Sequence, residues 1–236
     1  MSSISTKKYV IIFCIPGNNF SRNFMNSWTN TIFALCRSNK YDVIVSNQFS
    51  SQVNFARAMC LGANVLGGVS QKPFQGKIKY DAIIWLDSDM VFSPEQIFTL
   101  IEKTLHEHKV FSGIYFMNGG SNLCCVENWD LSYYKKYGSF EFLTKEKLGQ
   151  YIKDDKRYLK CAYVGMGCMG IRYGMLEDER LKYPWFFRNI EKIDDNIYEG
   201  ISEDVSFIKN LIDSGIIDNV VVDLKLKFGH EKSIIY

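Results

Sequence analysis

Two aspartates, Asp87 and Asp89, form the strongest chemical signal in the sequence. They follow the apolar run IIWL at residues 83–86, and only Ser88 separates them. In an extended backbone, residues two apart point to the same side, so the two carboxylates are predicted to converge while Ser88 faces away. In open α/β sheets the ligand site lies beyond the carboxyl ends of the strands. The pair therefore predicts a hard-oxygen site for Mn²⁺ or Mg²⁺, which would bridge substrate phosphates.

Two enzyme classes use such a pair at the end of a strand. One is the nucleotide-sugar glycosyltransferases with their Asp-x-Asp motif. The other is the haloacid-dehalogenase-type phosphohydrolases, in which Asp87 would be the nucleophile and Val91 falls in the matching place. Chain position favours the first class, because the phosphohydrolase motif normally ends the first strand and here two predicted strands precede it. A sugar-nucleotide-binding protein without catalysis remains a third alternative.

Two further candidates lie downstream in the sequence. Asp204 is placed by the segment SEDVSFIKNL, residues 202–211, in the first turn of a predicted amphipathic helix. Acids favour this position because of the helix dipole, but Asp204 could also act as a general base toward an acceptor hydroxyl. His230 follows a predicted strand near the C-terminus, and its imidazole could complete a metal shell. The glycines of GMGCMG, residues 165–170, permit close backbone approach to a ligand.

Strands alternating with helices are predicted to position these groups. The continuous apolar runs 9–15, 41–47, 80–87 and 110–116 predict strands covered on both faces. Helices are predicted over residues 21–37 and 95–106, with one apolar helical face over 52–66. Ser93 and Pro94 are predicted to begin the helix over 95–106. The pattern predicts an α/β fold with a largely parallel sheet.

The second half of the chain is less regular. A helix over Glu203–Asp213 and a strand over residues 219–224 are predicted near its end. Residues 118–160 match no pattern, and the charged stretch at 145–160 fits either a solvated helix or a flap. The tyrosines in this region, Tyr133, Tyr134 and Tyr137, fit either a sugar contact or a packed aromatic patch. With no evident linker, one domain over residues 1–236 is the simplest organisation.

The composition indicates which kinds of partner and which cellular compartment to expect. The chain has 28 basic and 26 acidic residues, which argues against a nucleic-acid partner. Its 7 cysteines include no CxxC pair, which favours reduced thiols and a cytoplasmic location, the host cytoplasm if the protein is viral. Residues 9–15 are interpreted as a strand rather than a signal peptide. No transmembrane segment is expected, because no run approaches about 20 apolar residues.

The ordered set of motifs resembles the GT-A glycosyltransferases, particularly the compact, inverting, family-2-like members found in bacteria and large DNA viruses. The matching positions are the Pro16-Gly17 loop, NFAR at 54–57, LDSD at 86–89, the glycine segment at 164–172, PWF at 184–186, SEDVSF at 202–207 and Gly229-His230. The resemblance implies a GT-A fold, with a nucleotide-binding half at about 1–116 and an acceptor half at 117–236 that share one sheet.

The same resemblance implies a donor site and a metal site. Pro16 and Gly17 would hold the nucleoside with their backbone, and Arg57 would contact the base or the diphosphate. Asp87 and Ser88 would also lie at the donor, which is expected to be a UDP-sugar. The metal, Mn²⁺ or Mg²⁺, would be held by Asp89, His230 and Asp87.

An acceptor site is implied as well. Asp204 would be the catalytic base, and Trp185, Glu203 and Gly167 would lie at the acceptor, a glycan or glycoprotein hydroxyl. One departure is Ser202, which stands where the family usually has glycine before Glu-Asp. The sequence thus predicts a metal-dependent glycosyltransferase that acts with inversion, and residues 118–160 are the candidate region for acceptor specificity.

Overall fold

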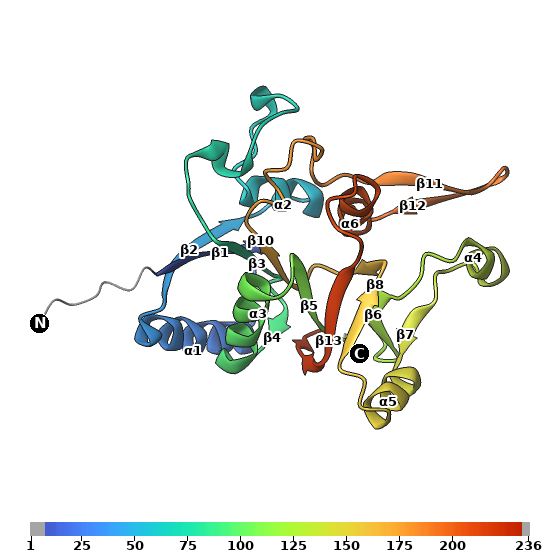
Figure 1. Cartoon of the computed structure of the whole chain (residues 1–236), viewed down its shortest axis with the longest axis horizontal. Coiled ribbons are helices and arrows are strands. Elements are labelled where there is room, and N and C mark those ends of the chain that lie inside the picture. Colours follow the sequence, from blue (N-terminus) through green and yellow to red (C-terminus); the bar gives the residue numbers. More distant parts are fainter. Residues whose placement is uncertain (1–7, 233–236) are drawn as a thin grey trace, which may run out of the picture.

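The computed structural model describes residues 8–232, and its centre is a seven-stranded sheet (Figure 1). The strand order is β2-β1-β3-β10-β5-β13-β8. The strands are β1 (Tyr9–Pro16), β2 (Tyr41–Gln48), β3 (Ala82–Leu86), β5 (Val110–Ile114), β8 (Tyr158–Cys161), β10 (Cys168–Arg172) and β13 (Val220–Lys227). Strands β1, β2, β3, β5 and β13 share one direction, whereas β10 and β8 run antiparallel to their neighbours.

The predicted fold class is confirmed as an α/β arrangement with a mostly parallel central sheet flanked by helices. Strands from residues 1–116 and from residues 117–236 share this sheet. Strand β10, from the second half, lies between β3 and β5 of the first half, and β13 pairs with the other edge of β5. The alternation of strands and helices in the sequence predicted parallel strands, and it gave no sign that β10 inserts antiparallel between β3 and β5.

Helices cover both faces of the sheet. They are α1 (Arg22–Ser38), α2 (Val53–Cys60), α3 (Pro94–His106), α4 (Leu131–Tyr137), α5 (Lys145–Lys153) and α6 (Glu203–Asp213). Alternate residues of β1 separate into two cores. Phe13 packs with α1 and α3 on one face, and Ile12 packs with α2 and α6 on the other. This two-sided burial explains why β1 is apolar throughout.

Three smaller strand groups complete the fold. Strands β6 (Asn122–Val126), β7 (Phe142–Thr144) and β9 (Tyr163–Val164) form a separate three-stranded sheet. Strands β11 (Asn189–Asp194) and β12 (Ile197–Ile201) form a hairpin, which lies beside α4 at one end of the molecule (Figure 1). Strand β14 (Gly229–His230) pairs with β4 (Met90–Val91), directly after the two aspartates.

Several predicted elements are confirmed. Ser93 caps α3 in a reciprocal capping box with Gln96, and Pro94 is its first residue. Helix α6 has the predicted bounds. The charged stretch at 145–160 begins with α5, so a helix is formed there rather than an irregular flap.

Other boundaries differ from the prediction. The helix expected over 52–66 ends at Cys60, because Leu61 leaves helical geometry and Gly62 takes a φ of +68°. Residues 65–67 and 73–76 form the short 3₁₀ helices η1 (Val65–Gly67) and η2 (Pro73–Gly76). The strand expected over 110–116 ends at Ile114, and the one expected over 219–224 continues to Lys227. Among residues 8–232, no helix is both long and apolar enough to cross a membrane.

Candidate active site

Asp87 and Asp89 lie in a tight turn beyond the carboxyl end of β3. The Met90 amide donates to the Asp87 carbonyl at 3.1 Å, which closes the turn. The predicted extended backbone is therefore wrong at this point, although both aspartates line the same cavity. The turn exists because the chain must reverse into β4 and pair with β14. As a consequence, each carboxylate has its own basic partner.

Asp87 is bound by the buried guanidinium of Arg57, which comes from α2. Arg57 Nη2 lies 3.0 Å from Oδ1 and 3.3 Å from Oδ2 of Asp87, and Arg57 Nε donates to Glu203 Oε1 at 3.1 Å. Arg57 is only 3% exposed. Burial lowers its pKa, but the charges of Asp87 and Glu203 outweigh burial and raise the pKa above the usual value. Arg57 thus stays charged and links Asp87 to Glu203 at the start of α6.

The carboxyl group of Glu203 has a raised pKa. Burial is the larger cause and the charge of Asp204 adds to it, against the opposing effect of Arg57. Glu203 is 5% exposed, and its side chain is engaged by Arg57. The structure therefore places Glu203 as a buried support for Arg57.

Asp89 is bound by His230 and Lys232. The His230 Nε2 atom lies 3.3 Å from Asp89 Oδ2, and the Lys232 ammonium donates to the same oxygen. Although burial raises the pKa of Asp89, these hydrogen bonds and charges lower it to about 2. The hydrogen bond with Asp89 raises the pKa of His230. The prediction that the chain returns His230 to the aspartates is confirmed.

The tautomer of His230 is set by the backbone. Its Nδ1 atom lies 2.7 Å from the Phe116 carbonyl oxygen. A carbonyl only accepts, so Nδ1 carries a proton, and in the neutral ring the lone pair of Nε2 faces Asp89. Metal-binding histidines are commonly held in this way through the second ring nitrogen.

These groups surround a cavity of about 340 Å³. Its lining includes Asp87, Asp89, His230, Lys232 and Tyr115. The donor set fits a divalent cation, since it offers two carboxylates and an oriented imidazole. Over residues 8–232, however, no three His, Cys, Asp or Glu side chains are gathered into a ready ligand cluster. The structure pairs Asp89 with His230 and holds Asp87 separately on Arg57.

Asp204 lies in the first turn of α6 and accepts several hydrogen bonds. Tyr163 Oη donates to Oδ2 at 3.0 Å, the Val205 amide donates to Oδ1 at 2.9 Å, and the Ser202 hydroxyl also donates to Oδ1. Burial, together with the charge of Asp204, raises the pKa of Tyr163, so this phenol remains a donor. Tyr163 Oη also lies 3.7 Å from Cys124 Sγ, which lines the aspartate cavity. Tyr163 is thus the link between the cavity and Asp204.

Cys124 is not a nucleophile in this environment. Burial is the largest of the causes that raise the pKa of its thiol to about 11, so the thiolate is scarce near neutral pH.

The Pro16-Gly17 loop touches the aspartate turn. Gly17 has a φ of +137°, and a β-carbon there would lie 2.7 Å from Ser88 Oγ. Asn47, at the end of β2, donates to the carbonyls of Ile15 and Gly17, each at 2.7 Å. The predicted donor residues Pro16, Gly17 and Ser88 are therefore neighbours at one edge of the sheet, and Gly17 leaves backbone accessible there.

The structure corrects the predicted place of Trp185 and defines that of Gly167. Trp185 is 0% exposed and packs in the core against Tyr183, so it does not line an open acceptor site. The PWF segment, residues 184–186, contributes Trp185 and Phe186 to the apolar core rather than to the surface. Gly167 is buried and contacts two residues that line the cavity: its amide donates to Tyr115 Oη at 3.1 Å, and its carbonyl accepts from the Asp87 amide at 3.1 Å.

Sequence reasoning missed four residues of this site, namely Tyr115, Cys124, Tyr163 and Lys232. Tyr115 directly follows the apolar strand β5, and Tyr163 belongs to β9. An aromatic residue at such a position normally indicates packing in the core. Only Lys232 carried a usable signal, because it lies two residues after His230 and a strand directs both to the same side.

Comparisons with known proteins give structural neighbours only. No protein-family model matches the sequence, and no curated protein matches it. Among solved structures, the chain is similar to A197 from STIV, with 14% identity over 97% of this chain and 96% of that one, at a TM-score of 0.48. It is also similar to glucosyl-3-phosphoglycerate synthase from Mycobacterium tuberculosis in complex with Mn²⁺, UDP-glucose and phosphoglyceric acid, with 14% identity over 97% of this chain and 73% of that one, at a TM-score of 0.48.

A further structure of the same synthase, with Mg²⁺ and UDP, gives 13% identity and a TM-score of 0.45, with coverage of 96% of this chain and 73% of that one. The neighbours thus include a protein of the class that the sequence resemblance named.

Proposed function

We propose that this chain is a metal-dependent glycosyltransferase that moves a sugar from a nucleotide-sugar donor to an acceptor hydroxyl. The observation that supports it most is the cavity at the carboxyl edge of the sheet, where Asp87, Asp89 and His230 meet from opposite ends of the chain. One neighbouring synthase structure contains Mn²⁺ and UDP-glucose and the other contains Mg²⁺ and UDP, and a UDP-sugar is the donor that we favour.

Each donor-side residue has a role in this proposal. Asp89 and His230 would hold the cation, with Asp87 completing the set, and when bound the cation would neutralise charge on the leaving diphosphate. Arg57 fixes Asp87 and presents a buried Nη1 donor that has no partner among residues 8–232. Lys232 brings a mobile positive charge to the same cavity and could move from Asp89 to a phosphate oxygen. Gly17 and Ser88 would border the nucleoside.

Asp204 is proposed as the general base. The acceptor oxygen forms a bond to the anomeric carbon while the bond from that carbon to the diphosphate oxygen breaks. The proton of the acceptor hydroxyl passes to Asp204, and the electron pair of the broken bond leaves with the nucleoside diphosphate. Tyr163 and the Val205 amide fix the carboxylate orientation for this transfer. Direct displacement inverts the anomeric configuration.

A thermal-shift panel tests the donor site. Nucleoside diphosphates and their sugars are compared with and without Mn²⁺, because a ligand that binds the folded state raises Tm. We expect a metal-dependent rise with UDP that disappears in Asp89→Ala. Asp195→Ala, which removes an exposed carboxylate of the β11–β12 turn, is the matched control and should retain the rise. Equal stabilisation in Asp89→Ala would refute the metal role.

Turnover assays test the chemistry. Asp204→Asn should keep donor binding and lose transfer by roughly 10²–10⁴-fold, the usual contribution of a general base. NMR of the product anomer should show inversion, and a retained anomer would exclude direct displacement. Release of inorganic phosphate from simple monoesters, without any UDP-sugar binding, would instead indicate a phosphohydrolase.

A further inference from the structure

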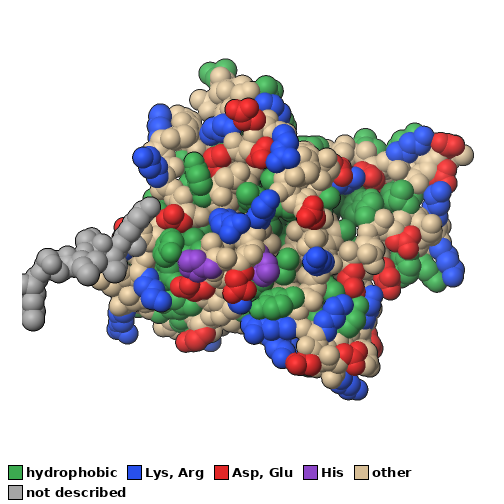
Figure 2. Space-filling view, viewed as in Figure 1, with side chains coloured by type: hydrophobic (Ala, Val, Ile, Leu, Met, Phe, Trp, Pro, Cys, Tyr) green, Lys and Arg blue, Asp and Glu red, His purple; other side chains and the backbone are tan. Residues whose placement is uncertain are grey.

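A second cavity is lined by Tyr163, which donates to Asp204, and by Val205, the residue after Asp204. Its volume is about 200 Å³, and it is enclosed by α4, the loop after α4, strand β12 and the start of α6. The lining residues that matter here are Trp129, Tyr134, Phe140, Tyr163, Glu199 and Val205. Figure 2 shows hydrophobic side chains gathered on the surface between the β11–β12 hairpin and α4. The cavity is smaller than the roughly 300–1,000 Å³ of pockets for drug-sized ligands, so it suits a single ring.

Aromatic rings build one wall of this cavity. The ring centroids of Trp129 and Phe140 are 4.0 Å apart in a stacked arrangement, and those of Tyr134 and Phe140 are 4.9 Å apart. The stacking fixes these side chains, so the wall is preformed. A pyranose ring exposes apolar C–H groups on its faces, and rigid aromatic surfaces are suited to cover them.

Polar groups occur among these rings at positions suited to hydroxyl groups. The Tyr134 hydroxyl donates to a Glu199 carboxylate oxygen, which leaves the other oxygen available. Within the described part of the chain, the Trp129 Nε1 atom is buried and lacks a hydrogen-bond partner. The indole nitrogens of Trp85 and Trp185 also lack one, but those side chains are fully enclosed in the core. An unpaired buried donor costs free energy, and a ligand oxygen in the cavity would satisfy it.

The cavity adjoins the proposed base through two of its lining residues. Tyr163, which donates to Asp204 at 3.0 Å, forms part of the lining, and so does Val205, the residue after Asp204. A group held in the cavity would therefore lie beside the Asp204 carboxylate. Glu199 is the charged side chain among the described lining residues. The nearby Lys209 ammonium, 5.7 Å from the Trp129 ring centroid, is paired with Glu191 and Asp213, so an anionic acceptor is disfavoured.

We propose that this cavity is the acceptor subsite and that it holds one neutral sugar ring of a carbohydrate acceptor. The inference rests on the proposed glycosyltransferase function in naming the ring an acceptor, but the binding itself can be measured without donor or metal. In this proposal the acceptor is recognised by α4, the loop after α4 and the β11–β12 hairpin. Trp185, which the sequence resemblance placed at the acceptor, has no part in it.

The first experiment observes binding at Trp129 directly. The chain has four tryptophans, so a ¹H–¹⁵N spectrum contains four indole resonances, and Trp129→Phe identifies the relevant one by its loss. Methyl glycosides of glucose, galactose, mannose, N-acetylglucosamine and xylose are titrated one at a time, with glycerol as the control. We expect at least one glycoside to shift the Trp129 resonance saturably. If no glycoside shifts it, the subsite is absent, whether or not UDP binds.

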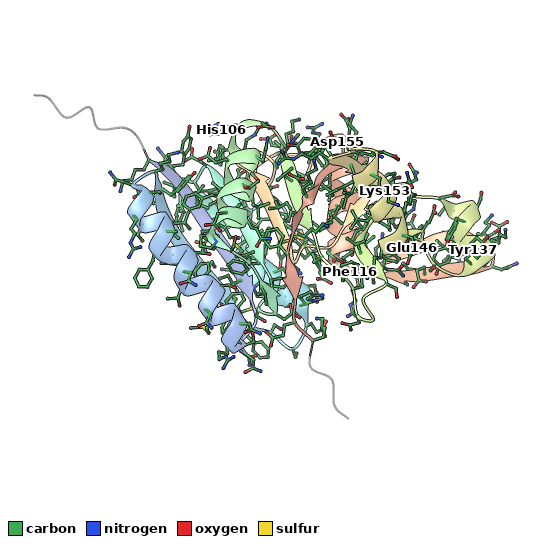
Figure 3. The ribbon with its side chains drawn as sticks, turned by 90° about the horizontal axis from the view of Figure 1, so that it is seen from below. His106, Phe116, Tyr137, Glu146, Lys153 and Asp155 are labelled. Atoms are coloured by element: carbon green, nitrogen blue, oxygen red, sulfur yellow. The ribbon has the colours of Figure 1, made fainter. Side chains whose placement is uncertain are left out.

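The second experiment compares two tyrosines of the same helix. Tyr134 lines the cavity, whereas Tyr137 stacks on Tyr133, is 56% exposed and lies outside the cavity. Figure 3 shows Tyr137 at the far end of the molecule. Tyr134→Ala should weaken glycoside binding and raise the acceptor KM by about tenfold or more, while Tyr137→Ala leaves both unchanged. Donor hydrolysis should be the same in both variants.

The outcomes separate the two proposals. Metal-dependent UDP binding with no glycoside effect at Trp129, or with equal effects of Tyr134→Ala and Tyr137→Ala, overturns the subsite and leaves the glycosyltransferase function in place. A glycoside shift at Trp129 without any nucleotide binding overturns the proposed function and keeps the sugar site. Tyr134→Phe, which keeps the ring, should retain most of the binding and shows that a loss in Tyr134→Ala is not due to misfolding.

Discussion

Arg57 is a buried cation between two carboxylates of different elements. It contacts Asp87 after β3 and Glu203 at the start of α6, and it also lies 5.6 Å from the ring centroid of Trp85. Removing one partner of a buried ion pair is costly because the remaining charges stay desolvated. This residue therefore joins the stability of the fold to the geometry of the site.

Arg57→Met should lower the free energy of unfolding by about 3–5 kcal/mol, because two carboxylates would be left near one another without a counter-charge. Urea denaturation measures the loss. The double variant Arg57→Met/Glu203→Gln should recover part of it, since one charge is removed. Lys192→Ala, which breaks an exposed pair with Asp195, is the control and should cost about 1 kcal/mol or less. A similar small loss in Arg57→Met would show that the pair is not structurally important.

Tyr163 is expected to act by positioning the base. Its hydroxyl is a permanent donor to Asp204, and the Val205 amide and Ser202 hydroxyl hold the other carboxylate oxygen. Tyr163→Phe should reduce kcat for transfer by about tenfold or more through misplacement of the carboxylate, with donor KM unchanged. Steady-state kinetics with varied donor separates the two constants. A raised donor KM at constant kcat would instead place Tyr163 in donor binding.

At the scale of elements, the contact between β10 and α3 is unusually close. A β-carbon at Gly170 of β10 would lie 2.0 Å from Thr104 Oγ1 of α3, and Thr104 is 0% exposed. The helix can approach the antiparallel strand only because residue 170 has no side chain.

Gly170→Ala should therefore destabilise the protein by about 1–3 kcal/mol through overpacking. Thermal and urea unfolding report the change. Gly170→Ala/Thr104→Ala should be more stable than the sum of the two single variants predicts, because the clashing hydroxyl and methyl groups are gone. Gly200→Ala in β12, where a β-carbon meets nothing within 4 Å, is the control and should change stability little. Strict additivity of Gly170 and Thr104 would contradict the close contact.

The sequence predicted the elements whose patterns are local. Strands β1, β2 and β3 and helices α1, α3 and α6 were evident because apolar periodicity and capping residues act within a few positions. The insertion of β10 between β3 and β5 was not evident, because strand pairing depends on contacts far apart in the chain. For the same reason, the PWF segment around Trp185 gave no sign of whether its indole faces a ligand or the core.

The candidate site follows the same division. Asp87, Asp89 and Asp204 were found because acids at a strand end and a helix start are local signals. Their partners could not be assigned, since Arg57 reaches Asp87 from α2 and Tyr163 reaches Asp204 from β9. A turn after the strand was the less favoured alternative at Asp87, and the pairing of β4 with β14 that follows it joins segments more than a hundred residues apart.

At the scale of the whole molecule, the two halves of the chain are interdependent. Strand β3 needs β10 as a neighbour, and β5 lies between β10 and β13. The first half alone would leave one edge of β3 unpaired and β5 without either neighbour, and it would lack Glu203, His230 and Lys232 at its site. The halves inferred from the sequence are therefore expected to be parts of one folding unit rather than separable domains.

Urea unfolding should accordingly be a single cooperative transition. Far-ultraviolet circular dichroism reports the whole backbone, and tryptophan fluorescence can be restricted to one half, by Trp28 in α1 or by Trp129 and Trp185 in the second half, if the other tryptophans are replaced by phenylalanine. Coincident midpoints are the expected result, since neither half can lose its strands without exposing the core of the other. The isolated segment 1–116 should be unfolded by the same measures. Two separated midpoints, or a folded 1–116 segment, would show that the nucleotide-binding half is an autonomous domain and that the shared sheet does not couple the two halves.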